Sequence, residues 1–176
     1  GEVIKYGAIL DRDIFNLIAN NLEDLLNLAN PELLMEVIGR CAKLKADVVA
    51  EDEREGGKRR ILNFGHTIGH ALETNFGFDT LRHGEAVAYG MLAAGKLSIE
   101  DGRMKNEDFE LLEEIIGKLP LPILPKFDPN DILQIMQRDK KVRGRKIHFV
   151  LLEELGKAVI VDNVTKRSII NAVERL

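Results

Sequence analysis

Tryptophan is absent from this 176-residue sequence, tyrosine occurs twice, and Cys41 is the single cysteine. One cysteine excludes an internal disulfide framework and is typical of a chain that works in a reducing cytoplasm. The scarcity of aromatic residues leaves no stacking platform for single-stranded nucleic acid. Basic residues are not in excess, because 25 Lys and Arg stand against 29 Asp and Glu, which argues against general nucleic-acid binding. No apolar run approaches the ~18–20 residues of a membrane span.

What remains is the composition of an ordinary globular domain. Hydrophobic residues make up 45% and charged residues 31% of a length that suits one domain. The sequence opens GEVIKYG, without an initiator methionine, and we expect it to be a fragment of a longer protein.

Apolar residues recur at helical spacing through most of the chain, and we interpret the charged stretch 51–60 as a solvated turn. The predicted helices cover residues 11–28, 31–48, 63–73, 83–100, 106–119, 129–137 and 165–176. Two β-like runs, 146–152 and 157–161, surround Gly156 and predict a hairpin. The expected fold class is therefore mainly α, a multi-helix domain with a small β-hairpin that occupies residues 1–176. We expect Cys41 on the apolar face of its helix to belong to the core.

Two glycines interrupt the predicted helix 63–73. Gly65 and Gly69 each cost about 1 kcal/mol relative to alanine in a helix. Two glycines four residues apart therefore predict the close approach of another segment more than they favour the helix itself.

Three of the four histidines lie within 18 residues: His66, His70 and His83. The i, i+4 spacing of His66 and His70 puts both imidazoles on one helix face, about 6 Å apart along the axis. Imidazole pairs suit Zn²⁺ and related metals, so spacing alone nominates His66 and His70 as ligands. Thr67 follows His66 where the metalloprotease motif HExxH has its general-base glutamate, which excludes that motif.

The histidine pair also has a structural interpretation, in which both side chains simply form hydrogen bonds within a helix. The third histidine, beside glycines, favours a site instead. A divalent ion would also take a carboxylate, and the sequence leaves several candidates open, with Glu73 and Glu85 nearest.

Basic side chains gather in two segments, which would suit a phosphorylated or carboxylated substrate near a metal. The alternative is that such runs form solvated surface. The two groups are Lys43, Lys45, Lys58, Arg59 and Arg60, and later Arg138, Lys140, Lys141, Arg143, Arg145 and Lys146.

Taken together, these segments resemble the C-terminal domain of the 3-dehydroquinate synthase family. The stretches that carry the resemblance are EVIKYG at 2–7, KADVVAEDEREGGKRRILNFGHTIGHALE at 45–73, LRHGEAVAYGM at 81–91, and DKK at 139–141 followed by the KIHFVLL strand. They appear in family order over nearly the whole chain. The wider superfamily includes glycerol and iron-containing alcohol dehydrogenases.

The resemblance implies a ligand set different from the one that spacing nominates. It places the metal on Glu2, His66 and His83, with His70 as a nearby active-site residue. Positions that contact substrate in the family correspond here to Lys5, Lys45, Arg59, Asn63 and one of Lys140 and Lys141.

The resemblance also implies an activity: conversion of the seven-carbon sugar-acid phosphate DAHP to 3-dehydroquinate and phosphate in the shikimate pathway. The family reaction is a transient NAD-dependent oxidation, phosphate elimination, reduction, ring opening and aldol closure. The implied cofactors are NAD and Zn²⁺ or Co²⁺, and the implied assembly is a homodimer. Nothing in this sequence matches the family's N-terminal NAD-binding α/β domain, so we expect a fragment that is inactive alone.

Three other functions remain open at this point. A 2-deoxy-scyllo-inosose synthase uses similar chemistry on glucose 6-phosphate and shares much of the motif set. A dehydrogenase of simple alcohols fits the cluster of cations less well. A non-catalytic helical binding or scaffold domain would keep the histidines as structure and would bind no stoichiometric metal.

Overall fold

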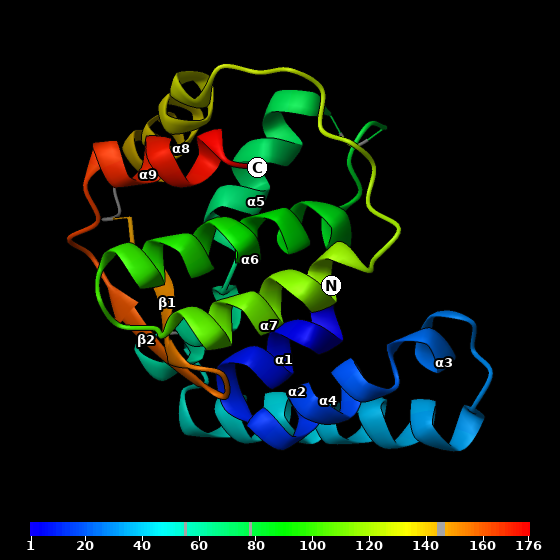
Figure 1. Cartoon of the computed structure of the whole chain (residues 1–176). Helices are drawn as coiled ribbons and strands as arrows, with labels where there is room; N and C mark the ends of the chain where they lie inside the picture. The colour runs from blue at the N-terminus through cyan, green and yellow to red at the C-terminus, as the bar shows by residue number, and fades with distance from the viewer. Residues whose placement is uncertain (55, 78, 144–146) are drawn as a thin grey trace.

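The computed structural model describes residues 1–54, 56–77, 79–143 and 147–176, without the side chains of residues 139–143. Within these ranges the chain is mainly helical with one two-stranded antiparallel hairpin, as predicted (Figure 1). The elements in chain order are α1 (Glu2–Leu10), α2 (Arg12–Asn20), α3 (Leu22–Leu26), α4 (Pro31–Glu51), the 3₁₀ helix η1 (Lys58–Asn63), α5 (His66–Phe76), α6 (His83–Glu100), α7 (Asn106–Gly117), α8 (Pro129–Arg143), β1 (Phe149–Glu154), β2 (Lys157–Val161) and α9 (Lys166–Glu174).

Helix α6 runs through the middle of the molecule and separates two hydrophobic clusters (Figure 1). One of its faces, with Val87 and Met91, packs into a cluster formed with α1, α2, α4, α7 and η1. The opposite face, with Ala93 and Leu97, packs into a second cluster formed with α5, α8 and α9. Because α6 is buried on two sides, its small residues allow neighbouring helices to approach from both.

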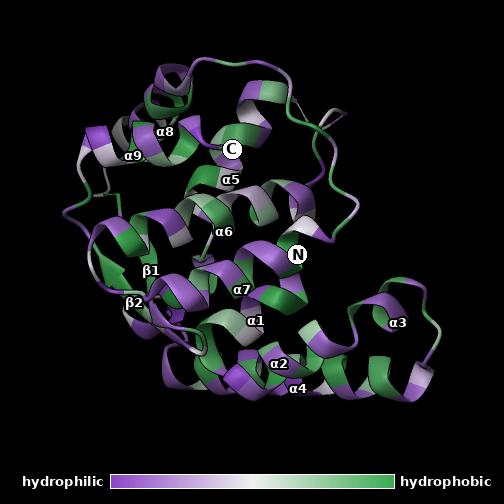
Figure 2. Cartoon of the chain, viewed as in Figure 1, coloured by the Kyte–Doolittle hydropathy of each residue, from purple (hydrophilic) through white to green (hydrophobic). Residues whose placement is uncertain are grey.

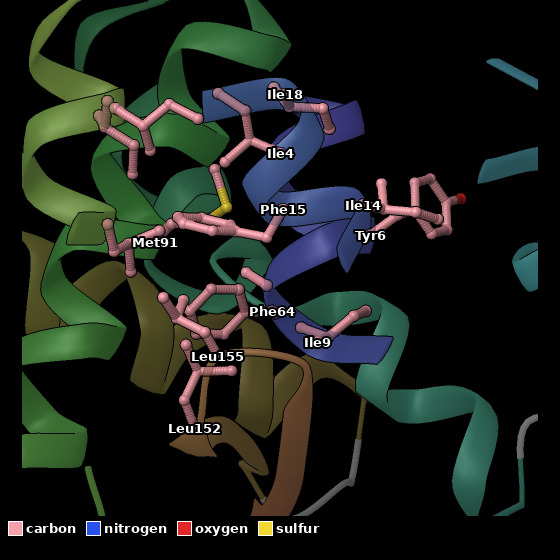
Figure 3. Close-up of a cluster of buried hydrophobic side chains, with 14 of the residues drawn as sticks. Ile4, Tyr6, Ile9, Ile14, Phe15, Ile18, Phe64, Met91, Leu152 and Leu155 are labelled. Atoms are coloured by element: carbon pink, nitrogen blue, oxygen red, sulfur yellow. The ribbon is translucent and has the colours of Figure 1, made fainter. Parts of the chain in front are cut away.

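Strand β1 lies between the same two clusters, because successive side chains of a strand point to opposite faces. Val150 and Leu152 point into the first cluster, whereas Phe149 and Leu151 belong to the second. The hairpin is held against α6 by the buried hydroxyl of Ser98, which accepts the N–H of Leu152 at 2.9 Å. Figure 3 shows Leu152 beside Phe64 and Leu155 in the first cluster.

The N-terminal helix α1 was not among the predicted elements. All residues from Ile4 to Ile9 are buried, so the segment lacks the one-sided apolar pattern by which a surface helix is recognised. Ile4 and Ile9 contribute to the first cluster (Figure 3). When most residues of a helix are buried, its sequence shows little contrast between an apolar and a polar face, so the helical period is hard to recognise.

Other differences from the prediction are local. The predicted helix 11–28 is two helices, because the Asn21 side chain donates to the carbonyl of Leu17 at 2.9 Å and ends α2. Helix α7 begins at Asn106, as predicted, and ends at Gly117, two residues before the predicted end. The predicted start of α4 is confirmed, since Asn30 Oδ1 accepts the N–H of Leu33 and Pro31 follows at the first helical position.

Helix α3 and the first half of α4 extend away from the rest of the chain (Figure 1). Hydrophobic and hydrophilic residues alternate along α4 (Figure 2), and Met35 and Ile38 on this part of it are exposed. Cys41, in the same helix, is buried in the first cluster, as predicted. Among the described residues, no helix combines the length and the apolar character needed to cross a membrane.

Candidate metal and substrate site

The three histidines singled out from the sequence form one cluster. His66 is the first residue of α5, His70 lies one turn further on, and His83 is the first residue of α6. Their ring centroids are separated by 5.4 Å for His66 and His70, 5.2 Å for His66 and His83, and 5.7 Å for His70 and His83. One potential ligand nitrogen from each ring lies within 4.8 Å of the other two. The fold thus gathers donor atoms that suit a divalent metal.

Three glycines allow this convergence, because they bring the backbones of α5 and α6 into direct contact. A Cβ at Gly90 would lie only 1.9 Å from the carbonyl oxygen of Gly65, and a Cβ at Gly69 would lie 3.0 Å from the carbonyl oxygen of Ala86. Gly65 also has φ +77°, a left-handed conformation that admits the start of α5. The predicted close approach at Gly65 and Gly69 is confirmed, and Gly90 is its counterpart on α6.

The carboxylate of Glu2, the first residue of α1, reaches the same cluster. Its Oε2 accepts a hydrogen bond from Lys5 Nζ at 2.9 Å. Its Oε1 is buried, accepts no hydrogen bond from any described residue, and lies 3.6 Å from His66 Nε2. Two ligands that each lie about 2.0–2.2 Å from a tetrahedral zinc ion are about 3.4 Å apart, so this separation fits atoms that share a metal.

Neighbouring charges keep Glu2 ionised. Burial acts to raise the pKa of Glu2, but the hydrogen bond and charge of Lys5, with smaller effects of His66 and His83, hold it below its usual value. Burial lowers the pKa of Lys5, Glu2 opposes this effect, and the positive charge of Lys45 adds to it.

In His66 and His83, which each begin a helix, the Nδ1 atom forms a hydrogen bond to an oxygen. His66 Nδ1 donates to the carbonyl oxygen of Phe64 at 3.1 Å, and His83 Nδ1 lies 3.1 Å from Glu73 Oε1. Burial and the charge of Lys5 lower the pKa of His66 in spite of Phe64 and Glu2, which favours the neutral ring. A neutral imidazole with Nδ1–H bound to an acceptor offers the Nε2 lone pair to a metal.

The two carboxylates nearest in sequence have other contacts in the fold. Glu73 is buried in α5 and is paired with His83. The side chain of Glu85 accepts the backbone N–H of Arg82 at 2.8 Å and so caps α6. Sequence reasoning did not find the pairing of Glu73 with His83, because the partners belong to different helices and no periodicity relates them.

Most described residues of the predicted solvated turn 51–60 are exposed, and its backbone is organised around one carboxylate. Asp52 accepts the backbone N–H groups of Gly56, Gly57 and Arg59 at 2.8–3.0 Å, and these bonds hold the pKa of Asp52 below its usual value. The guanidinium of Arg59 lies over this loop, where Nη1 donates to the carbonyl oxygen of Glu53 at 2.8 Å.

The structure describes the remaining predicted substrate positions only in part. Asn63, the last residue of η1, lies near Thr67, Gly90 and Phe149. Lys140 and Lys141 lie in α8, but their side chains are outside the described part of the chain. The structure therefore does not show which of the two would contact substrate.

A metal fits the residues that are present. Three imidazoles offer nitrogen donors within reach of one another, and Glu2 Oε1 lies 3.6 Å from one of them. The buried Glu2 Oε1 accepts no hydrogen bond from a described residue, and the Nδ1 atoms of His66 and His83 are held by acceptors. These are the features of a site built from imidazole and carboxylate ligands with supporting hydrogen bonds.

Comparison with known proteins gives one family. Residues 1–142 match the family model described as 3-dehydroquinate synthase C-terminal. The 3-dehydroquinate synthase of Nostoc punctiforme is 46% identical over 166 residues, which are 93% of this chain and 46% of the relative. That of Desulforamulus reducens is 43% identical over 171 residues, which are 96% of this chain and 47% of the relative. The chain therefore spans about half the length of the curated relatives it matches.

Solved structures agree in fold. A 2-epi-5-epi-valiolone synthase from Streptomyces hygroscopicus, solved with NAD⁺ and Zn²⁺ bound, superposes with a TM-score of 0.83 at 22% identity, over 99% of this chain and 49% of that one. A 2-deoxy-scyllo-inosose synthase complexed with carbaglucose-6-phosphate, NAD⁺ and Co²⁺ gives a TM-score of 0.81 at 28% identity, over the same shares of the two chains. With the family model and the relatives above 40% identity, these matches show that the chain belongs to the 3-dehydroquinate synthase family, where it corresponds to the C-terminal domain.

Proposed function

We propose that this chain forms the metal- and substrate-binding part of a 3-dehydroquinate synthase, which converts DAHP to 3-dehydroquinate and phosphate. The observation that carries the proposal is the buried Glu2 Oε1, which lies 3.6 Å from His66 Nε2 and accepts no hydrogen bond from a described residue. A buried carboxylate oxygen without a partner is costly, and a shared metal ion would remove that cost. Glu2, His66 and His83 are the proposed ligands, with His70 beside them.

The metal, Zn²⁺ or Co²⁺, would supply Lewis acidity towards a substrate hydroxyl, and NAD would accept and return hydride. The chain's own residues prepare the surroundings. Lys5, whose side chain is 4% exposed, holds one oxygen of Glu2 and leaves the other available. His70, at 5.4 Å from the His66 ring, is in place to contact a substrate hydroxyl or to move a proton.

The charges around the cluster suit a substrate with a phosphate and a carboxylate. Helices α5 and α6 both begin at this point, so the positive ends of two helix dipoles face the site. Lys5 and Lys45 add positive charge, and Arg59 would bring a guanidinium that can bind an anion through two hydrogen bonds. We infer that Lys5, Lys45, Arg59, Asn63 and one of Lys140 and Lys141 contact the substrate.

The rest of the enzyme corresponds to the half of the relatives that this chain does not match. We propose that NAD binds mainly to that half, that the whole protein is a homodimer in the cytoplasm, and that the 176 residues alone do not turn over DAHP. Detectable formation of 3-dehydroquinate by the isolated chain with NAD⁺ and Zn²⁺ would contradict the last statement.

The metal site is tested by elemental analysis of the purified chain after dialysis against Zn²⁺. His66→Ala and His83→Ala should each lose the bound zinc. His148→Ala is the matched control, because the side chain of this fourth histidine has no part in the cluster. Full zinc content in either ligand variant would refute the assignment, and a wild-type chain that binds no zinc would favour the non-catalytic helical domain.

The substrate is tested with the full-length protein. Formation of 3-dehydroquinate and phosphate from DAHP supports the proposal. Turnover of glucose 6-phosphate without turnover of DAHP would instead assign the protein to the chemistry of its 2-deoxy-scyllo-inosose synthase neighbour, which is 28% identical.

A further inference from the structure

Glu73 is a buried carboxylate that the proposed reaction does not use. It lies in the second half of α5 and is 4% exposed. Its Oε1 accepts a hydrogen bond from Nδ1 of His83, the first residue of α6, at 3.1 Å. The contact therefore joins two helices at the edge of the histidine cluster.

A carboxylate at such a position needs a partner, because burial of an isolated charge is costly. The residues just before Glu73 on the same helix, Ala71 and Leu72, are apolar and buried. The imidazole of His83, by contrast, is half exposed, with 50% of its side chain accessible. The buried partner is fixed by packing and the exposed partner is not, so it is Glu73 that orients His83.

The chemistry of the pair sets the protonation of the ring. A carboxylate oxygen accepts hydrogen bonds, so Nδ1 of His83 is the donor in this 3.1 Å contact and carries the proton. In the neutral ring the lone pair is then on Nε2. His66 reaches the same state through the carbonyl oxygen of Phe64, a backbone acceptor that substitution cannot remove.

We propose that Glu73 is a positioning residue, which holds the His83 ring and selects the tautomer with its lone pair on Nε2, the form that binds a metal. This inference rests on the proposed metal site. It adds a carboxylate that touches neither metal nor substrate and acts through His83.

The first test uses the metal-free chain and needs neither zinc nor turnover. Long-range ¹H–¹⁵N correlation spectra distinguish the two neutral tautomers of each histidine at a fixed pH. In the wild type His83 should be protonated on Nδ1. In Glu73→Ala the ring should shift towards the Nε2–H form that free imidazole prefers. Glu73→Gln keeps the size of the side chain but can either accept from or donate to Nδ1, so it should give a mixture.

The second test measures Zn²⁺ affinity by competition with a chelator. Glu73→Ala should bind zinc about 10–100-fold more weakly, and Glu73→Gln should lie between it and the wild type. Asp108→Asn is the matched control, because Asp108 is also a buried carboxylate but contacts Arg12 and the backbone of Leu155. This variant should lose stability and keep zinc affinity.

The outcomes separate the two proposals. An Nε2–H tautomer of His83 in the wild type, or wild-type tautomer and zinc affinity in both Glu73 variants, would overturn the role of Glu73. If Glu73→Ala does not fold, the isosteric Glu73→Gln decides. Retention of zinc by His83→Ala would overturn the ligand set, whereas the tautomer of the metal-free chain would still decide what Glu73 does.

Discussion

Replacing Gly90 with alanine would place a methyl group where helices α5 and α6 are in backbone contact. The added Cβ would lie 1.9 Å from the carbonyl oxygen of Gly65, 2.8 Å from its carbonyl carbon and 2.9 Å from the amide nitrogen of Gly69. These are backbone atoms at the start of α5, so no side-chain rotation can relieve the clash. The two helices would have to separate.

The required displacement can be estimated from the contact itself. Ordinary contacts of a Cβ begin at 3.4 Å, so the shortest of these distances falls about 1.5 Å short. Overpacking typically costs about 1–3 kcal/mol, and alanine returns about 1 kcal/mol through its better helix propensity. Because the clash is with backbone, we expect the upper end of that range, a net loss of about 2 kcal/mol. For a chain of this size the loss corresponds to a fall of about 4–8 °C in Tm.

The effect on metal binding should be larger than the effect on stability. His66 and His70 belong to α5 and His83 to α6, so a separation of the helices widens the histidine cluster directly. Metal–ligand distances tolerate about 0.2 Å, several times less than the expected displacement. Zn²⁺ affinity should therefore fall by about a hundredfold, comparable to the removal of an important supporting group.

Gly39→Ala provides the control. Gly39 lies in the middle of α4, and a Cβ there would meet nothing within 4 Å. This variant should gain up to about 1 kcal/mol from helix propensity and keep its zinc affinity. Thermal unfolding and chelator competition on both variants are the assays. A Gly90→Ala protein with the stability and zinc affinity of Gly39→Ala would refute the close-contact argument.

Three further changes test separate parts of the structure. In the full-length protein, Arg59→Ala should raise the KM for DAHP about tenfold with zinc retained; unchanged steady-state kinetics would exclude Arg59 from the substrate site. Ser98→Ala removes the acceptor of the buried Leu152 N–H and should lower the unfolding free energy by about 1–3 kcal/mol in urea, while an unchanged midpoint would count against that bond. Gly156→Ala should cost about 1–3 kcal/mol, since Gly156 has φ +90° and a Cβ would lie 2.7 Å from Arg12 N; a stabilised variant would contradict this.

Helix α6 could be predicted from the sequence although it is buried on two sides, whereas α1 could not. The bounds of α6 agree with the prediction, 83–100, because its small residues and flanking polar groups mark both ends. Helix α1 was missed because burial of Ile4 to Ile9 removes the contrast on which periodicity depends. At the break between α2 and α3, the side chain of Asn21 donates to the carbonyl oxygen of Leu17.

The candidate site shows the same division. Spacing brought His66 and His70 together, since both lie on one helix, and the glycines at 65 and 69 indicated a close neighbour. Spacing could not include Glu2, which lies 64 positions before His66 in the sequence, and only the resemblance to a family suggested it. The ligand role of Glu2 stays a prediction.

The sequence by itself determined the composition of the site: which donor types are present, which helices carry them, and that a second backbone must approach Gly65 and Gly69. Only the tertiary structure decided the pairing between helices, such as Glu73 with His83 and Gly90 with Gly65. The physical reason is the distance along the chain over which each effect acts. Propensity and periodicity act over a few residues of one element, whereas these contacts depend on how α5 and α6 pack against each other within the two hydrophobic clusters.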